Sequence, residues 1–264
     1  MPIITVSRGS YHHGKSISEK LAEELGYACL SRDQLIDELE EFHLPEIKMV
    51  RGLRDAISAL DRFPYGKERF KAAMTSSVLQ HFLPGNIVFH GLVSHYFVRH
   101  ISHVVKVRVV ADTKSRIADE MKRENISSEK ARLILKNDDA ERRKWGMFLY
   151  GIDIQDPLAY NLVVNIGEMS ENEAVDIIAS VAKLDRFQET DISRKALADT
   201  ALNARIRNRL FDFPSASIAA KDGEAVIALK VPSNQQDFIT ERIDSMLEGV
   251  DTLNRYTLEF EPHF

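Results

Sequence analysis

The chain has 264 residues, 44% of them hydrophobic and 28% charged, a composition that is ordinary for a soluble globular protein of one or two domains. The formal net charge of −5 argues against a protein that binds nucleic acid or a membrane surface. The sequence has no apolar run of about 18 residues for a membrane span, and its N-terminus lacks the pattern of a signal peptide. Because Cys29 is the single cysteine and can form no internal disulfide, we expect a cytoplasmic protein.

Residues 9–16 read GSYHHGKS and match the phosphate-binding pattern G-x-x-x-x-G-K-S, the Walker A motif. Gly9 and Gly14 allow a tight turn that aims backbone N–H groups at phosphate oxygens. Lys15 can reach the β- and γ-phosphates of a nucleoside triphosphate, and the Ser16 hydroxyl suits Mg²⁺. We expect a helix to start at Ser16 and to turn its positive end toward the same phosphates.

The segments around this motif have the order that its chemistry needs. Residues 3–6 form a short apolar, β-branched run typical of a buried parallel strand. Apolar residues recur at helical spacing after the motif, and Gly26 is placed to end that helix. Strand, glycine loop and amphipathic helix in this order favour a working phosphate site over a chance match.

Further along the chain, strands and helices alternate. We predict strands at 27–30, 86–91, 104–110 and 162–165, and helices at 32–42, 67–82, 114–124, 127–136, 138–145 and 174–182. Ser170 and Glu173 form a capping box before the last of these helices. The alternation predicts an α/β fold of three layers, with a parallel sheet covered by helices on both faces.

The pattern changes after residue 184. Residues 185–195 are polar and resemble a linker, and a helix is predicted at 196–210. Next come a hairpin with Asp222-Gly223 as its turn, a helix at 234–247 and a strand at 256–261. We therefore predict a first domain at 1–184, a linker at 185–195 and a small α+β domain at 196–264 with the order α-β-β-α-β.

Residues 1–184 resemble the cytidylate kinase-like family of P-loop nucleoside monophosphate kinases. The stretches that carry this resemblance are Ile4–Gly9, Gly14–Ser16, Glu19–Tyr27, Ser31–Asp33, Asp139–Arg143, Tyr150–Asp153, Asp156-Pro157 and Tyr160–Asn165. The C-terminal segment resembles a BON-type domain, through its topology and through Gly249-Val250 followed by a closing strand.

The kinase resemblance implies a three-layer P-loop kinase fold that uses ATP and Mg²⁺ and has a nucleoside monophosphate, usually CMP, as the phosphate acceptor. It implies catalytic roles for Lys15, Arg142 and Asp33. It assigns the nucleotide to Gly9, Ser10, His13, Gly14, Lys15, Ser16 and Ile17, the Mg²⁺ to Ser16, and the acceptor to Arg32, Asp33, His90 and Arg143.

The lid is expected in the charged segment that contains Arg142, Arg143 and Lys144. Phosphoryl transfer needs positive charge delivered to the transferring group, and Asp139 is spaced to orient Arg142 by an (i, i+3) pair. The other interpretation of this segment is a solvated charged helix.

The acceptor is expected over the carboxyl ends of the strands, where Arg32 and Asp33 follow the second strand and are candidates to bind the acceptor or Mg²⁺. Asp33 is equally suited to stabilise a helix N-terminus. His90 ends the third strand, where it can make a polar contact or move a proton, or be a structural histidine. The spacing of the histidines from 90 to 103 does not fit a zinc site. Residues 40–80 are expected to form an acceptor-binding flap with ionic groups at Arg51, Arg54, Asp55, Arg62 and Lys67.

Two departures from the family leave two functions open. The chain has Gly91-Leu92 where many members have Gly-Arg, and Ser31 where many have an acidic residue. The first hypothesis is a kinase that transfers phosphate directly and in line. The second is a regulatory protein whose kinase-like domain senses a nucleotide and whose C-terminal domain binds a ligand, a protein partner, a phospholipid or a second copy of the chain.

Overall fold

The computed structural model describes residues 2–40, 56–91 and 95–261. The first part of the chain builds one parallel five-stranded sheet with the order β2-β3-β1-β4-β5. Its strands are β1 (Ile3–Arg8), β2 (Ala28–Ser31), β3 (Ile87–Gly91), β4 (Val104–Ala111) and β5 (Leu162–Ile166). The predicted parallel sheet and α/β class are confirmed.

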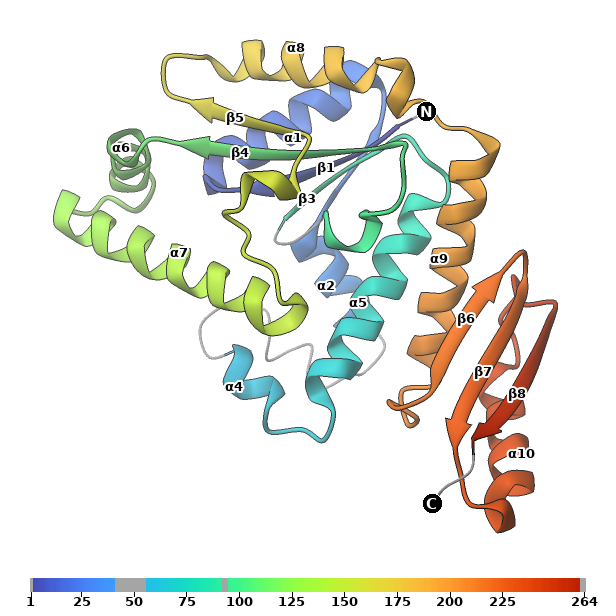
Figure 1. Cartoon of the computed structure of the whole chain (residues 1–264). Coiled ribbons are helices and arrows are strands. Elements are labelled where there is room, and N and C mark those ends of the chain that lie inside the picture. Colours follow the sequence, from blue (N-terminus) through green and yellow to red (C-terminus); the bar gives the residue numbers. More distant parts are fainter. Residues whose placement is uncertain (1, 41–55, 92–94, 262–264) are drawn as a thin grey trace.

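Helices cover both faces of this sheet (Figure 1). On one face lie α1 (Tyr11–Leu25) and α8 (Glu171–Ala182), which bury Ile17 and Ile178 against the strands. On the other face lie α2 (Arg32–Glu40) and α5 (Gly66–Phe82), with α4 (Ala56–Leu60) next to α5. Because the inner strands β1 and β3 are covered on both faces, they are buried along almost their whole length.

A helical hairpin projects beside the sheet, formed by α6 (Thr113–Glu124) and α7 (Ser128–Tyr150) (Figure 1). The sequence predicts two helices at 127–136 and 138–145, but α7 is one helix of 23 residues. The predicted break is wrong because no glycine or proline interrupts the segment between them. The predicted cap at Ser127 is confirmed, since its side chain accepts the Lys130 N–H.

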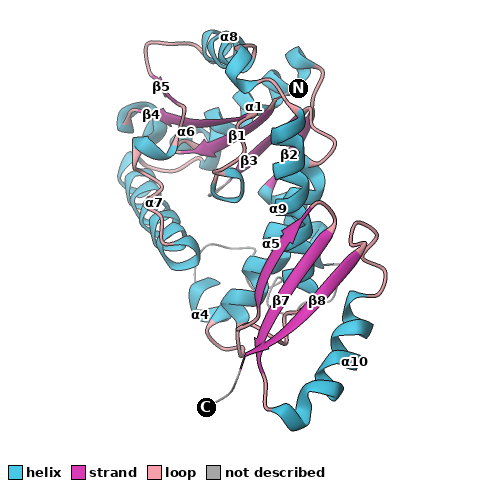
Figure 2. Cartoon of the chain, turned by 45° about the vertical axis from the view of Figure 1, so that its right-hand side comes forward, coloured by secondary structure: helices cyan, strands magenta, loops and turns pink. Residues whose placement is uncertain are grey.

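The C-terminal part is a second, smaller α/β unit (Figure 2). It contains α9 (Asp191–Arg209), β6 (Ser217–Lys221), β7 (Glu224–Lys230), α10 (Gln236–Leu247) and β8 (Arg255–Glu261). β7 pairs antiparallel with β6 and parallel with β8. Asp222 and Gly223 both have positive φ angles, as the predicted two-residue hairpin turn requires. Short 3₁₀ helices occur at Tyr96–Val98, Pro157–Ala159, Asp185–Phe187 and Ser233–Gln235.

Helix α9 belongs to both units. On one side Leu197 and Ala201 enter the core beneath the large sheet, and α9 packs along α5. On the other side Leu202 and Ile206 enter the core of the small sheet. The helix starts at Asp191, after a capping box made by Thr190 and Ser193, and therefore begins inside the segment expected to be a linker.

The packing of α9 connects the two units, because one helix contributes side chains to both cores. Among the described helices, none has both the length and the apolar character needed to cross a membrane. Phe187, in the same expected linker, is buried in the core on the α1 side of the large sheet. Residues 185–195 thus differ from a solvated linker, because their ends are held by apolar burial on both sides.

Replacement of Leu197 by Ala tests this shared helix. Leu197 is 2% exposed, so the cavity left behind lowers the free energy of unfolding by about 3 kcal/mol. Urea denaturation followed by circular dichroism and by tryptophan fluorescence measures it, and both probes should report one transition. The matched control is Ile192→Ala, because Ile192 is 83% exposed. Two separate transitions in the wild-type protein would contradict the sharing of α9 between the two cores.

Candidate active site

The carboxyl ends of three strands place charged residues at one edge of the sheet. β1 ends at Arg8, β2 ends one residue before Arg32, and β3 ends at His90 and Gly91. The register pairs Ser31 with His90, which brings the ends of β2 and β3 together. In an open parallel sheet this edge is where ligands bind.

The turn after β1 presses against β4. The Gly9 N–H donates to the Val109 carbonyl at 2.7 Å. A Cβ atom on Gly9 would lie 2.8 Å from Val110 Cγ1 and 2.9 Å from the Val109 oxygen, so only glycine fits there. Gly9 therefore has a packing role as well as the phosphate role predicted from the motif.

Helix α1 begins earlier than predicted. It starts at Tyr11 rather than at Ser16, and the Gly14 N–H donates to the Ser10 carbonyl at 3.1 Å. The physical reason is that Ser10 has the extended conformation of an N-cap and no glycine or proline follows until Gly14. The amide of Gly14 is thus used inside the helix, and the N–H groups of the first turn before it have no partner within the helix.

Three arginines converge at this edge. Arg142, on α7, donates to the Arg8 carbonyl at 3.1 Å. The Arg8 side chain crosses α1 at Gly14, where a Cβ atom would lie 2.6 Å from Arg8 Cγ. Burial lowers the pKa of Arg32, the Asp33 carboxylate opposes this, and the charges of Arg8 and Arg142 lower it further. A concentration of guanidinium groups in a partly dry site attracts phosphate.

Arg142 lies beside Arg8 at this edge, and the neighbouring Asp139 binds Arg116. Burial and then the charge of Arg8 lower the pKa of Arg142. The Asp139 carboxylate accepts two hydrogen bonds from Arg116 of α6, both at 2.8 Å. This bidentate pair ties α6 to α7, and the charge of Asp139 also opposes the lowering of the Arg142 pKa.

His90 is a neutral residue at this edge. It is 3% exposed, and burial together with the charge of Arg8 lowers its pKa to about 4, although Asp33 opposes the shift. Its Nδ1 atom has no hydrogen-bond partner among the described residues. A neutral imidazole adds a polar contact to the anion site without adding charge.

Lys15 lies at the surface, whereas Ser16 is hydrogen-bonded to Glu171. Lys15 is half-exposed, with its Nζ atom 3.8 Å from a Glu19 oxygen. The Ser16 hydroxyl donates to Glu171 Oε2 at 2.6 Å. His13 Nδ1 lies 2.9 Å from the other oxygen of Glu171, and its Nε2 lies 3.0 Å from Asp119. Glu171 therefore holds two residues of the predicted loop.

Glu171 is strongly biased toward its charged form. Burial raises its pKa, but hydrogen bonds from Lys20, Ser16 and His13 outweigh that effect and lower the pKa to about 2. Glu171 was not predicted as a site residue. Its position at the start of α8, in the connection that follows β5, was the available signal, since that strand ends at the same edge of the sheet.

Three other residues predicted for the site lie outside the arginine cluster or at its border. Arg143 donates to Asp153 at 2.6 Å on an exposed part of the molecule. Ile17 is fully buried in the core, so its side chain makes no contact with a ligand at the edge. Asp33 is half-exposed, and one of its oxygens lies 3.5 Å from Arg32 Nη1.

Part of the predicted acceptor flap is not described. Arg51, Arg54, Asp55 and Leu92 lie outside the described residues. Within the described part of the flap, Arg62 is exposed, and Lys67 Nζ lies 4.8 Å from the centre of the Phe148 ring on α7.

A hydrogen-bond network around Arg108, which was not predicted from the sequence, lies next to the end of β1. Arg108 lies within β4 and donates to the Ile154 carbonyl and, at 3.5 Å, to the Tyr160 hydroxyl. The Tyr160 hydroxyl lies 3.1 Å from Ser7 Oγ, next to the end of β1. Arg108, one of two charged residues inside an otherwise apolar strand, was the signal for it. The network fixes the segment after α7 against the sheet.

The residues present fit a triphosphate better than a self-contained metal site. Within residues 2–40, 56–91 and 95–261, no group of three acidic, histidine or cysteine side chains could hold a metal. Ser16 and Glu171 offer oxygen atoms, which Mg²⁺ prefers, but an ion there needs further oxygens from a nucleotide.

Replacement of Glu171 by Gln tests whether the negative charge of Glu171 stabilises the fold. The lowered pKa means that the carboxylate stabilises the fold above pH 4.5 and loses this contribution as the pH falls toward 2. We expect the variant to be less stable than wild type at pH 7, with the difference shrinking below pH 4.5, in urea denaturation at each pH. Glu168→Gln is the control for loss of a nearby exposed carboxylate. A difference independent of pH would count against this assignment.

Comparisons with known proteins place this geometry in a family. The sequence profile of the cytidylate kinase-like family matches residues 3–168. A cytidylate kinase of Pyrococcus horikoshii is 29% identical over 188 residues, which cover 69% of this chain and 90% of that protein.

Two solved structures are similar to this chain, and the first of them supports the fold. An uncharacterized protein from Eubacterium ventriosum has a TM-score of 0.54 and 17% identity, over 69% of this chain and 98% of that one. The protein TT1252 from Thermus thermophilus has a TM-score of 0.43 and 18% identity, over 69% of this chain and 97% of that one.

The matched residues stop before α9, so the BON-type resemblance of the C-terminal unit stays a prediction. The five-stranded parallel sheet, the layers of helices and the match over residues 3–168 lead to one conclusion. The chain belongs to the cytidylate kinase-like family, with the fold of a nucleotide kinase.

Proposed function

We propose that the protein is an ATP-dependent kinase that phosphorylates a nucleoside monophosphate of the CMP type. The observation that carries the proposal is the convergence of Arg8, Arg32 and Arg142 beside His90 at the carboxyl edge of the sheet. The family and its cytidylate kinase relative support this class of reaction. Charge of this kind is what phosphoryl transfer requires, because the protein has little covalent chemistry to perform.

Each group has a separate task in this proposal. Lys15 and the first-turn amides of α1 bind the phosphates of the donor. Arg32 and Arg8 hold the acceptor phosphate, with Asp33 orienting Arg32 from 3.5 Å. Arg142 is carried by the α6–α7 hairpin and neutralises charge on the transferring group. Transfer is direct and in line, without a phosphorylated enzyme.

Mg²⁺ neutralises charge on the phosphate oxygens when it is bound, and Ser16 is the residue of this chain placed to hold it. The Ser16 hydroxyl is engaged by Glu171 in this structure. Binding of the nucleotide would therefore require the Ser16–Glu171 hydrogen bond to be exchanged for new contacts.

A second function, nucleotide sensing without transfer, is favoured by one observation. The predicted loop is helical from Tyr11, and Glu171 holds both His13 and Ser16. A loop kept in this state binds nucleotide only after a rearrangement. Such a rearrangement suits a protein that reports nucleotide to a partner, because nucleotide binding then changes its conformation.

The two functions are separated by phosphoryl transfer to a panel of nucleoside monophosphates, with ATP–Mg²⁺ as donor. Calorimetric titration of ATP–Mg²⁺ on the same preparation measures binding. We expect transfer to one acceptor, CMP, and loss of ATP binding in Lys15→Ala. Tight ATP binding with no transfer to any acceptor would reject the kinase in favour of the sensor.

A pair of adjacent arginines tests the catalytic assignment. Arg142→Ala should lower kcat about 100-fold with little change in the dissociation constant of ATP, because this arginine acts on charge that develops during transfer. Arg143→Ala is the matched control: its guanidinium is bound to Asp153, so kcat should stay near that of wild type. The reverse order of effects would move the lid function from Arg142 to Arg143.

A further inference from the structure

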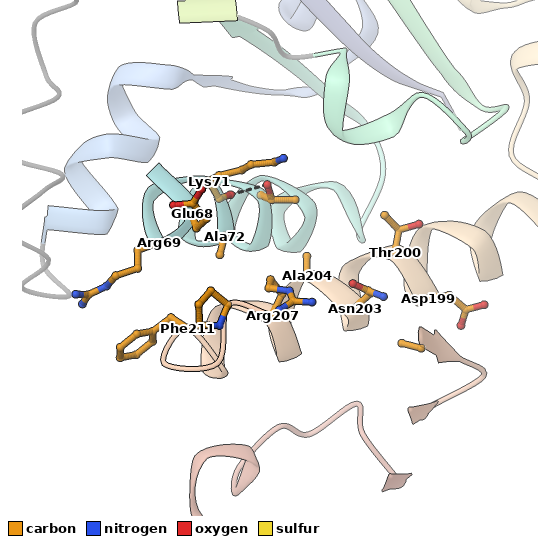
Figure 3. A pocket seen from close by; sticks show the side chains of 13 residues that line it. Glu68, Arg69, Lys71, Ala72, Asp199, Thr200, Asn203, Ala204, Arg207 and Phe211 are labelled. Carbon is orange, nitrogen blue, oxygen red and sulfur yellow. Dashed lines mark hydrogen bonds between the residues drawn. The ribbon is translucent and has the colours of Figure 1, made fainter. Parts of the chain in front are cut away.

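A cavity lies between the two units of the chain, away from the sheet edge that carries the arginine cluster. It has a volume of about 520 Å³ and is bounded by α5 on one side and by α9, the segment after it and β6 on the other. Figure 3 shows Arg69 and Ala72 on the α5 side and Asn203, Arg207 and Phe211 on the α9 side. Ordinary packing leaves few voids larger than a water molecule, and this volume is within the range of small-molecule sites.

The cavity has an apolar floor because small side chains meet there. Ala72 of α5, Ala204 of α9 and Ala220 of β6 leave the space between the elements unfilled. Pro214 and the ring of Phe211 extend the apolar wall. Phe211 is 36% exposed, and the Arg69 guanidinium lies over its ring at 4.6 Å from the centre. An apolar, partly aromatic wall of this kind suits a flat ligand.

Arg207 supplies the specific charge. Its guanidinium donates to the carbonyls of Ala216 and, at 3.4 Å, of Phe213, so within the described part of the chain its hydrogen-bond partners are neutral. Burial lowers its pKa. Figure 3 places it between Phe211 at one end of the cavity and Asp199 at the other. A half-buried cation without a carboxylate partner gains most from an anion.

Two acidic residues line the cavity, and neither is a hydrogen-bond partner of Arg207 in the described part of the chain. The Asp199 carboxylate accepts the Asp222 N–H at 2.7 Å, which turns it toward the β6–β7 turn. Glu68 is an exposed residue of α5. Arg69 and Lys71 add positive charge on the α5 side, although Lys71 Nζ also lies 5.5 Å from the Tyr96 ring centre.

We propose that this cavity is a binding site for a small aromatic anion, whose carboxylate or phosphate is held by Arg207 and whose ring packs on Phe211 and the alanine floor. The ligand contacts α5 and α9 together and therefore bridges the kinase-like unit and the C-terminal unit. This site is separate from the phosphate site and does not depend on the phosphoryl transfer proposed above.

The test uses the full chain and three probes: benzoate, phenyl phosphate and the uncharged benzyl alcohol. Calorimetric titration and the thermal unfolding midpoint are measured for each. Benzoate or phenyl phosphate should bind and raise the midpoint, and benzyl alcohol should bind at least about tenfold more weakly. Which of the two anions binds more tightly distinguishes a carboxylate site from a phosphate site.

Two variants assign the binding to this cavity. Arg207→Met should weaken the anion about tenfold or more, whereas Arg209→Met, on an exposed position of the same helix, should leave it unchanged. Ala220→Phe fills the cavity from an edge strand and should abolish binding even if Arg207→Met does not fold. This variant also separates the cavity from the arginine cluster of the sheet edge, which it does not touch.

Three results would overturn the proposal. The first is no binding of either anion to the wild-type chain. The second is binding that persists unchanged in Ala220→Phe and in a folded Arg207→Met. The third is binding of benzyl alcohol as tight as that of the anions, which would show that the site does not select a negative charge.

Discussion

The parallel register of the large sheet is the constraint on which the site depends. Because β1, β2 and β3 all run in one direction, the residues that follow them arrive at one edge, whatever their separation along the chain. Arg8 and Arg32 are brought together in this way, and α7 adds Arg142 from the side. The charges of these cations oppose one another, and an anion bound among them would stabilise the site.

A second constraint is the double use of α9. Its two apolar faces are offset around the helix, so Leu197 packs beneath the large sheet while Leu202 and Ile206 pack on the small one. The two units are thereby joined by one helix that contributes to both cores. The cavity lined by Arg207 lies where this helix meets α5 and β6, and an alanine of each element lines it.

The state of the phosphate-binding segment links the fold to the chemistry. Glu171, at the start of α8, holds His13 and Ser16 through a carboxylate whose pKa is lowered to about 2. Any ligand that needs Ser16 competes with this charge. The energetic balance between the helical segment and a phosphate cradle is thus set by a residue some 155 positions away along the chain.

The sequence by itself determined the α/β class, the five parallel strands, the caps at Ser127 and Ser170 and the Asp222-Gly223 turn, because these follow from local periodicity and side-chain chemistry. It also pointed to Lys15, Arg32 and Arg142 through short motifs. Only the tertiary structure decided that α1 starts at Tyr11, that Arg116 takes Asp139, and that Arg8 and Glu171 reach the site. Those outcomes arise from contacts between elements distant in sequence, where hydrogen-bond geometry and burial select among several charged partners that a local pattern treats as equivalent.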